Sequence, residues 1–252
     1  MNHLFLSGSN GQLGKCFVNK FSENGWLTSG LDIDKSSVND NLESYVEGSV
    51  TSRSSWESIF ATMSISSRLE DSNHFCLINN AGVAVFTPSE ERTHDEFTDV
   101  VNINLLGPIF GTTEFYKFIK TRKLHRSRSN TFTVLNICSV YGHISPNPSI
   151  YTDTARNSSE IYGASKAGLA QMTRYFSVRY SSIPIRVNAI SPGGVENKLL
   201  QGEDFISNYS NLVPLGRLCQ ANEVADLAHA MVNSPDYFTG QVLMLDGGMS
   251  SW

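Results

Sequence analysis

Tyr162 and Lys166 lie four residues apart in the run 161–166, and their side chains are of types that can exchange a proton. If this run is helical, residues at that spacing share one face, and a phenol is stacked beside an ammonium. A free tyrosine hydroxyl has a pKa of roughly 10, and a neighbouring cation favours the phenolate. The spacing therefore predicts an acid/base pair for work near neutral pH. The same spacing also occurs on ordinary helix surfaces, so its meaning depends on the residues that accompany it.

Short apolar runs rich in branched and aromatic residues recur along the chain, and all but the last precede a segment with helical periodicity. These runs are Leu4–Leu6, Trp26–Leu31, Phe75–Ile78, Thr131–Ile137, Ile185–Ile190 and Val242–Leu245. Strands without polar alternation need cover on both faces. We therefore predict an α/β fold, namely a single-domain Rossmann fold whose doubly wound parallel sheet is flanked by helices on both faces. Ligands of such sheets bind beyond the carboxyl ends of the strands.

The composition favours one folded domain over residues 1–252. With 252 residues, of which 40% are hydrophobic, the chain can bury a full core, and no Pro/Gly/Ser linker or fixed-period repeat divides it. The serine-rich stretch Ser52 to Ser72 keeps apolar residues at helical spacing, which predicts a surface helix. Those residues are Trp56, Ile59, Phe60 and Met63.

Charge and cysteine usage exclude several classes of function. A net charge of −5 argues against nucleic acid or an anionic membrane as partner. The basic residues of 117–128 are typical of a solvated helix end. The four cysteines are scattered, with Cys76 and Cys138 inside strand-like runs, and neither they nor the six histidines have metal-ligand spacing. No signal-like or bilayer-length apolar segment occurs, so we expect a cytoplasmic protein. Because the cysteines and histidines lack metal-ligand spacing, we expect no metal.

A glycine-rich turn directly follows the first apolar run. Its residues include Gly8, Asn10, Gly11, Leu13 and Gly14, and a helix is expected to begin near residue 15. Glycines let such a turn be tight and let backbone N–H groups approach a pyrophosphate at the helix N-terminus. By itself the pattern could equally be a plain turn.

Asp32 ends the second apolar run, eighteen positions after Gly14 (32 − 14). An acidic residue there accepts hydrogen bonds from the hydroxyls of an adenosine ribose and repels a ribose phosphate. We therefore expect NAD(H) to be preferred, with NADP(H) not excluded because Lys15 and Lys35 are near in sequence. Asp34 competes for the same role.

Together these segments resemble the short-chain dehydrogenase/reductase family, and the likeness covers nearly the whole chain. The matching motifs are Ser7-Gly8, Asn79-Asn80-Ala81-Gly82, Asn104 within 104–107, Ser139, Tyr162 with Lys166, the run 186–195 and the run 239–248. The resemblance implies a homo-oligomer, a tetramer or a dimer, that acts on a small-molecule substrate.

The resemblance also implies a role for each matching residue. Tyr162 would exchange the proton at the substrate oxygen, Lys166 would lower the pKa of Tyr162 and hold the nicotinamide ribose, and Ser139 would hydrogen-bond the substrate. Asn104 would hold a water that links Lys166 to solvent. The remaining cofactor contacts implied are Asn80, Ala81 and Gly82 beside the adenosine, Ile33, Ser49 and Val50 beside the adenine, and Pro192, Gly193 and Val195 beside the nicotinamide.

These matches have structural alternatives. Ser139 could be a strand-end cap, Asn104 competes with Asn102, and Pro192-Gly193 could be a plain turn.

Three departures from the pattern of the single-domain members concern the glycine-rich turn, the spacing of Ser139 and Tyr162, and the contact sites Ser49-Val50 and Asn197. Gln12 takes the place of the middle glycine, and Asn197 occupies a position often held by threonine. Ser49-Val50 stands where many relatives have Asp-Val. Ser139 and Tyr162 are 23 apart (162 − 139), about ten more than usual and closer to enzymes that act on nucleotide sugars.

The extra residues between the serine and the tyrosine, from His143 to Glu160, are polar and must border the site, where loops commonly set specificity. We therefore consider His143 and Arg156 as substrate contacts, although either could be a solvated loop residue. The segment Gly202 to Leu215 resembles the substrate-covering helix of the family.

The sequence thus predicts an NAD(H)-dependent oxidoreductase that interconverts a secondary alcohol and a ketone on a polar, sugar-derived substrate. A second reading is a β-ketoacyl thioester reductase. A third, from another class, is a non-catalytic dinucleotide-binding scaffold.

Overall fold

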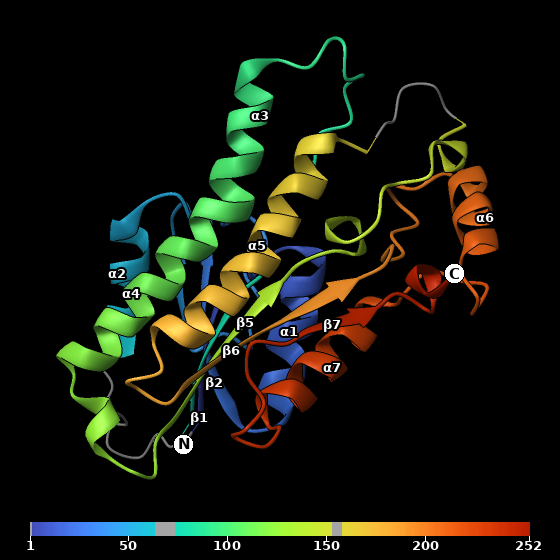
Figure 1. Cartoon of the computed structure of the whole chain (residues 1–252). Helices are drawn as coiled ribbons and strands as arrows, with labels where there is room; N and C mark the ends of the chain where they lie inside the picture. Colours follow the sequence, from blue (N-terminus) through green and yellow to red (C-terminus); the bar gives the residue numbers. More distant parts are fainter. Residues whose placement is uncertain (1, 64–73, 153–157) are drawn as a thin grey trace.

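The structure, a computed structural model, describes all residues except 1, 64–73 and 153–157. Seven parallel strands form one sheet in the order β3-β2-β1-β4-β5-β6-β7 (Figure 1). The strands are β1 (Asn2–Ser7), β2 (Trp26–Asp32), β3 (Ser44–Glu47), β4 (His74–Asn79), β5 (Thr131–Ile137), β6 (Ile185–Pro192) and β7 (Val242–Leu245). The α-helices are α1 (Gln12–Glu23), α2 (Arg53–Thr62), α3 (His94–Val101), α4 (Gly107–Thr121), α5 (Glu160–Arg179), α6 (Glu203–Leu212) and α7 (Ala221–Val232).

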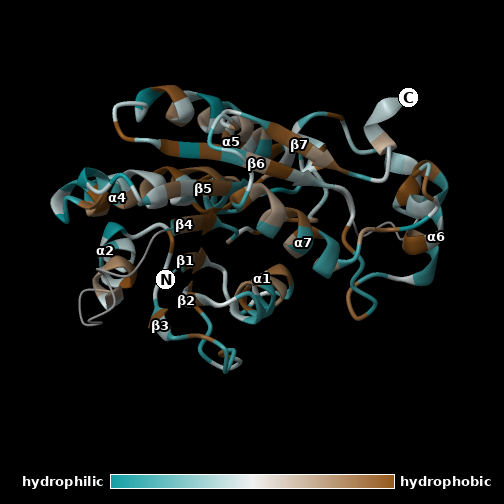
Figure 2. Cartoon of the chain, turned by 90° about the horizontal axis from the view of Figure 1, so that it is seen from below, coloured by the Kyte–Doolittle hydropathy of each residue, from teal (hydrophilic) through white to brown (hydrophobic). Residues whose placement is uncertain are grey.

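Helices cover the sheet on both faces, as the sequence predicts. Helices α1 and α7 lie on one face and α2, α4 and α5 on the other (Figures 1 and 2). One core cluster joins Phe17 and Phe21 of α1 to Val224 of α7, and a second joins α2, α4 and α5 to the opposite face. Every residue of β6 is buried, so this strand is covered on both faces.

All six apolar runs form strands, and the doubly wound fold is confirmed. The sequence reading missed β3, whose four residues are only half-buried or exposed and so leave no apolar signature at this edge of the sheet. The chain runs outward from β1 to β3 and then returns to β4 on the other side of β1. The loops after β1 and β4 therefore diverge beyond the carboxyl ends of these strands, where an open α/β sheet forms its ligand crevice.

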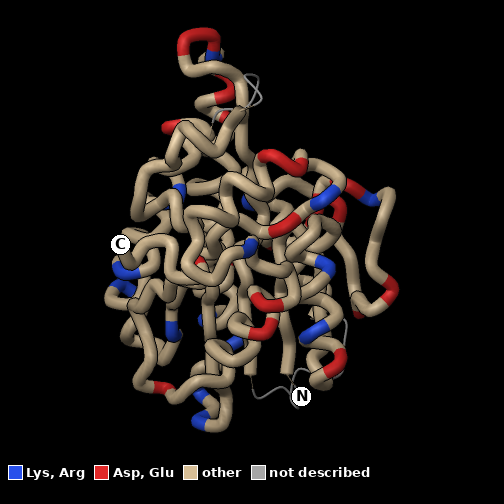
Figure 3. Tube along the Cα trace, turned by 90° about the vertical axis from the view of Figure 1, so that its right-hand side faces the viewer, with Lys and Arg blue, Asp and Glu red and all other residues tan. Residues whose placement is uncertain are grey.

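The expected helix within Ser52 to Ser72 is present as α2, although residues 64–73 lie outside the described chain. It buries Trp56, Ile59 and Phe60 against the sheet. Basic and acidic residues are interspersed over the chain (Figure 3). The basic residues expected at a helix end, within 117–128, begin in the last turns of α4 and continue directly after it.

Two glycines make the turn after β1 possible. Gly8 has φ +67°, a left-handed conformation that favours glycine, and a Cβ there would lie 2.9 Å from the Cα of Ala81. A Cβ on Gly14 would lie 2.0 Å from the carbonyl oxygen of Gly8. Helix α1 therefore starts in close contact with the loops after β1 and β4.

Trp56 connects the core to the loop after β3. Its ring is fully buried, and its Nε1 donates to the carbonyl of Val50 at 2.9 Å. On α4, a Cβ on Gly111 would lie 2.8 Å from the same ring. The position of Val50 is therefore set from beneath by the core.

We predict that Trp56→Ala lowers the free energy of unfolding by about 3–5 kcal/mol, because it leaves a large cavity. Trp56→Phe keeps most of the ring and removes the hydrogen bond to Val50, so we expect a loss nearer about 1–2 kcal/mol. Denaturant unfolding of both variants measures this difference, and equal losses would contradict the cavity argument.

Candidate active site

Tyr162 and Lys166 lie on one face of α5, in its first two turns, as the spacing predicts. The helix is capped by Ser159, whose hydroxyl accepts from the N–H of Tyr162 at 3.1 Å. The Lys166 side chain is 4% exposed, and its Nζ lies 5.8 Å from the centroid of the Tyr162 ring. That Nζ also donates to the carbonyl of Ile137, the last residue of β5, at 2.8 Å. The phenol and the ammonium therefore meet at the carboxyl end of the sheet.

Burial acts on both titrating groups of this pair. It raises the pKa of Tyr162 above its ordinary value, while a hydrogen bond with Ser139 lowers it. Burial also lowers the pKa of Lys166, because the ammonium loses hydration. The expectation that Lys166 brings down the pKa of Tyr162 stays a prediction.

Asn104 lies in a π-helical turn, Asn102–Leu106, between α3 and α4. Such turns often occur at functional sites because they redirect side chains. The Asn104 amide is fully buried and exchanges two 2.8 Å hydrogen bonds with the backbone of Val83. A Cβ on Gly82 would lie 3.3 Å from Asn104 Oδ1 and 3.4 Å from Lys166 Nζ, so these two groups border the same glycine.

Two adjoining clefts follow the carboxyl edge of the sheet and share Leu13, Asn80, Gly82 and Val83. The larger, of about 540 Å³, is lined by the expected adenosine-side residues Gly8, Asn10, Gly11, Leu13, Asp32, Ile33, Ser49, Val50, Asn80, Ala81 and Gly82. The second, of about 350 Å³, is lined by Ser139, Tyr162, Lys166, Pro192, Gly193 and Val195 among others. Gly14 lines neither cleft but lies beneath Gly8. The two clefts together form one groove for an extended ligand.

The side chain of Asn80 fixes the turn after β1. Its Nδ2 donates to the carbonyls of Ser7 at 3.1 Å and Gly8 at 3.0 Å, and its backbone N–H donates to Ser7 Oγ at 3.1 Å. The amide thereby joins the ends of β1 and β4 where the two halves of the groove meet.

Asp32 holds the other side of this turn. Its carboxylate accepts from the backbone N–H of Asn10 at 2.9 Å and of Asp34 at 3.1 Å, while still lining the larger cleft. Lys35 is paired with Glu47 at 3.2 Å. Asp34 also lines the cleft, but its side chain is exposed and accepts from Ser36.

The structure describes one of the two expected substrate contacts, His143, and not the other, Arg156. The ring of His143 lies 2.9 Å from Ser191 Oγ, and His143 lines neither cleft. The structure therefore places it against β6, and its role as a substrate contact stays a prediction. Arg156 lies outside the described residues.

Two departures noted in the sequence contact each other in the structure. Gln12 Nε2 donates to the carbonyl of Glu196 at 2.6 Å, and Asn197 Nδ2 donates to Gln12 Oε1 at 3.1 Å. The glutamine that replaces a glycine thus bridges the first turn to the loop after β6. Sequence reasoning noted both positions, but their separation of 185 residues hid the contact.

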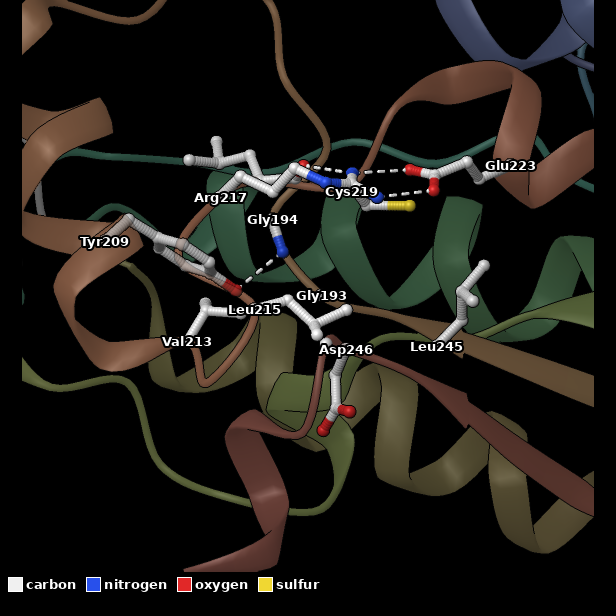
Figure 4. A pocket seen from close by; sticks show the side chains of 12 residues that line it. Gly193, Gly194, Tyr209, Val213, Leu215, Arg217, Cys219, Glu223, Leu245 and Asp246 are labelled. Carbon is white, nitrogen blue, oxygen red and sulfur yellow. Dashed lines mark hydrogen bonds and ion pairs between the residues drawn. The ribbon is translucent and has the colours of Figure 1, made fainter.

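Tyr209 of α6 belongs to the segment that was expected to cover the substrate. It is 2% exposed, and its hydroxyl accepts from the N–H of Gly194 at 2.5 Å (Figure 4). A Cβ on Gly194 would lie 2.7 Å from the Tyr209 ring. The small cavity in Figure 4, of about 60 Å³, lies beside this contact and is bordered by Asp246. Helix α6 is therefore attached directly to the loop expected to border the nicotinamide.

Within the described chain, no group of three His, Cys, Asp or Glu side chains could hold a metal ion. Nor does that part contain a helix long and apolar enough to span a bilayer.

Comparisons with known proteins agree with this geometry. The family model described as enoyl-(acyl carrier protein) reductase matches residues 12–250. An uncharacterised oxidoreductase of Schizosaccharomyces pombe is 30% identical over 256 residues, covering 98% of this chain and 90% of that protein. A tropinone reductase homologue of Arabidopsis thaliana is 28% identical over 261 residues, covering 99% of this chain and 93% of the relative.

Among solved structures, a short-chain dehydrogenase from Leptospira borgpetersenii with bound NAD+ superimposes with a TM-score of 0.85 at 29% identity. The match covers 99% of this chain and 92% of that one. The chain belongs to the short-chain dehydrogenase/reductase family. It is accordingly an oxidoreductase that acts on CH–OH groups with a nicotinamide dinucleotide.

We predict that Gln12 and Asn197 are energetically coupled. In a double-mutant cycle, Gln12→Ala and Asn197→Ala together should destabilise the fold less than the sum of the single changes, by about 0.5–1 kcal/mol. Denaturant unfolding gives the four free energies. Asn233→Ala, on the far end of α7, is the matched control and should be additive with Gln12→Ala. Additivity of the Gln12 and Asn197 changes would show that the bridge contributes nothing.

Proposed function

We propose that this protein is an NAD(H)-dependent oxidoreductase that interconverts a secondary alcohol and a ketone, with Tyr162 as acid/base. The observation that carries the proposal is that Tyr162, Lys166 and Ser139 all line the second cleft, which continues directly into the larger, glycine-lined cleft. A non-catalytic scaffold has no need of a buried ammonium beside a buried phenol.

The groove fits a dinucleotide. The close approach of Gly8 to Ala81 leaves backbone N–H groups without covering side chains at the start of α1, which suits a pyrophosphate. Asp32 would accept from the adenosine ribose hydroxyls, and the 72% exposed side chain of Ile33 offers an apolar surface to the adenine. When bound, the nicotinamide supplies or accepts the hydride.

The residues of the second cleft would handle the proton. In reduction, Tyr162 gives a proton to the substrate oxygen, and in oxidation its phenolate takes one. Ser139 holds the same oxygen through its hydroxyl. That hydroxyl lies close to Tyr162, because the two side chains share a hydrogen bond that lowers the pKa of Tyr162. Lys166 stabilises the phenolate and holds the nicotinamide ribose. Asn104 orders a water that connects Lys166 to solvent.

Preference for NAD(H) over NADP(H) rests on Asp32. Its carboxylate is held by two backbone N–H groups, so it would stay beside a ribose phosphate and repel it. Lys35, which could offset the repulsion, is engaged by Glu47. The β-ketoacyl thioester reductase remains the second candidate, supported by the description of the matching family model.

We further propose a homo-oligomer, a dimer or tetramer, located in the cytoplasm. In support of an interface, α5 exposes 51% of Tyr175 and 73% of Val178 on its outer side. Light scattering of the purified chain tests the assembly.

We predict that Tyr162→Phe lowers the rate of hydride transfer by about 10²-fold or more, because the proton exchange is lost. Binding of NADH should stay within about twofold of the original. The absorbance of reduced nicotinamide follows turnover, and its fluorescence follows binding. Tyr237→Phe, at a fully exposed position, is the control and should leave both unchanged. Retained turnover in Tyr162→Phe would refute the mechanism.

We predict that Asp32→Asn shifts the ratio of kcat/KM for NADPH over NADH by at least about tenfold toward NADPH. Removing a charge about 4 Å from a phosphate relieves about 1–4 kcal/mol of repulsion, and about 1.4 kcal/mol corresponds to a factor of ten. Asp34→Asn should change the ratio far less. A larger effect at residue 34 would reassign the ribose contact to Asp34.

A further inference from the structure

A row of aromatic rings lines the second cleft, beginning beside the loop after β6. The centroids of Tyr151 and Phe205 lie 5.7 Å apart, as do those of Phe205 and Tyr209, each pair tilted by 38°. Phe205 and Tyr209 belong to α6, whereas Tyr151 belongs to the extended loop between β5 and α5. The row is therefore assembled from two segments far apart in sequence.

The extended loop contacts α6 through its few apolar residues. Ile150 is fully buried in a cluster with Tyr209 and Val213, against which Ile144 and Tyr151 pack. Among the described residues of the loop, the apolar ones therefore form this wall, with Ser158 also lining the cleft. Its position is fixed by the same hydrophobic contacts that place α6.

Apolar and aromatic side chains outnumber the polar ones in the lining, which also includes Asn80, Ser139, Ser158 and Gln201. Val83, Phe86, Val140 and Tyr141 line the same cleft. Of the described residues that line it, Lys166 alone is charged, and its ammonium is already held by the Ile137 carbonyl. The described lining thus offers no further cation to a phosphate or carboxylate, and burying an unpaired anion there would be costly.

The hydroxyl of Tyr209 does not make the wall polar. Its oxygen accepts from the N–H of Gly194 (Figure 4). Aromatic walls of this kind favour flat or compact apolar skeletons, which gain from area buried and from ring contacts. Against the row, a polyhydroxylated substrate would leave hydroxyls without partners, because the Asn80 and Gln201 amides of the same lining already donate to backbone carbonyls.

We propose that the substrate is a neutral ketone or secondary alcohol carried on a compact apolar ring skeleton, rather than the sugar derivative expected from the polar loop. This inference rests on the proposed function. In reduction, the carbonyl carbon gains a hydride from the reduced dinucleotide as the C=O π bond breaks. The oxygen takes the proton of Tyr162, giving the secondary alcohol and the oxidised dinucleotide.

Binding to the Tyr162→Phe protein loaded with NADH tests this substrate class without requiring turnover. The probes are 1-decalone, a neutral bicyclic ketone, fructose, a polyhydroxylated ketone of similar size, and 2-oxoglutarate, an anionic one. Calorimetry should give a Kd for decalone at least about tenfold lower than for either other ketone. Equal or tighter binding of fructose or 2-oxoglutarate would overturn the proposal.

Variants of Phe205 test whether the aromatic row makes the contact. Phe205→Gln should weaken decalone binding by about fivefold or more, whereas Phe205→Leu, which stays apolar, should weaken it by about twofold or less. Tyr237→Gln, at a fully exposed position, is the control. NADH affinity, unchanged in all three, shows that they fold. Decalone binding that is insensitive to Phe205→Gln would refute the role of the row.

Turnover of the three ketones by the original enzyme separates this inference from the proposed reaction. Preferential binding of decalone without reduction of any ketone would refute the reaction and support the ring preference. Reduction confined to fructose or 2-oxoglutarate would support the reaction and refute the ring preference.

Discussion

The buried ammonium of Lys166 is the constraint on which the rest of the site depends. A charge taken out of water needs fixed dipoles around it, and here the carbonyl that ends β5 supplies one. Helix α5 must therefore approach the end of β5 closely. A Cβ on Gly142 would lie 2.9 Å from the backbone of Lys166 and Ala167, which shows how tight that approach is. The same approach brings Tyr162 to Ser139. It also brings Lys166 Nζ close to Gly82, which lines both clefts of the groove.

The two halves of the groove are built in different ways. The adenosine half is fixed by backbone-directed polar contacts of Asn80 and Asp32 close to the strand ends. The substrate half is fixed by hydrophobic packing between α6 and the loop before α5. Changes in that loop can therefore alter the substrate while the cofactor site and the Tyr162–Lys166 pair keep their geometry. This separation explains how a cofactor motif can be read from the sequence when the substrate cannot.

Much of the fold could be predicted because it rests on local patterns. Apolar runs without alternation identify six of the seven strands, and the four-residue spacing of Tyr162 and Lys166 places both on one helical face. The edge strand β3 escaped because half-exposed residues need no apolar signature. The Gln12–Asn197 bridge and the aromatic row depend on contacts between distant segments, which no spacing encodes. The character of the loop before α5 toward the substrate is likewise hard to predict, because composition counts all its residues and only a few of them line the cleft.

The coupling between Lys166 and Tyr162 can be measured directly. Carbon-13 labelling of the tyrosine ring would allow the pKa of Tyr162 to be titrated by NMR in the original protein and in Lys166→Met, both saturated with NAD+. Burial raises this pKa in both, so the difference between them isolates the effect of the ammonium. The account predicts a pKa at least about one unit lower in the original protein, corresponding to about 1.4 kcal/mol of phenolate stabilisation. Equal pKa values in the two proteins would contradict it.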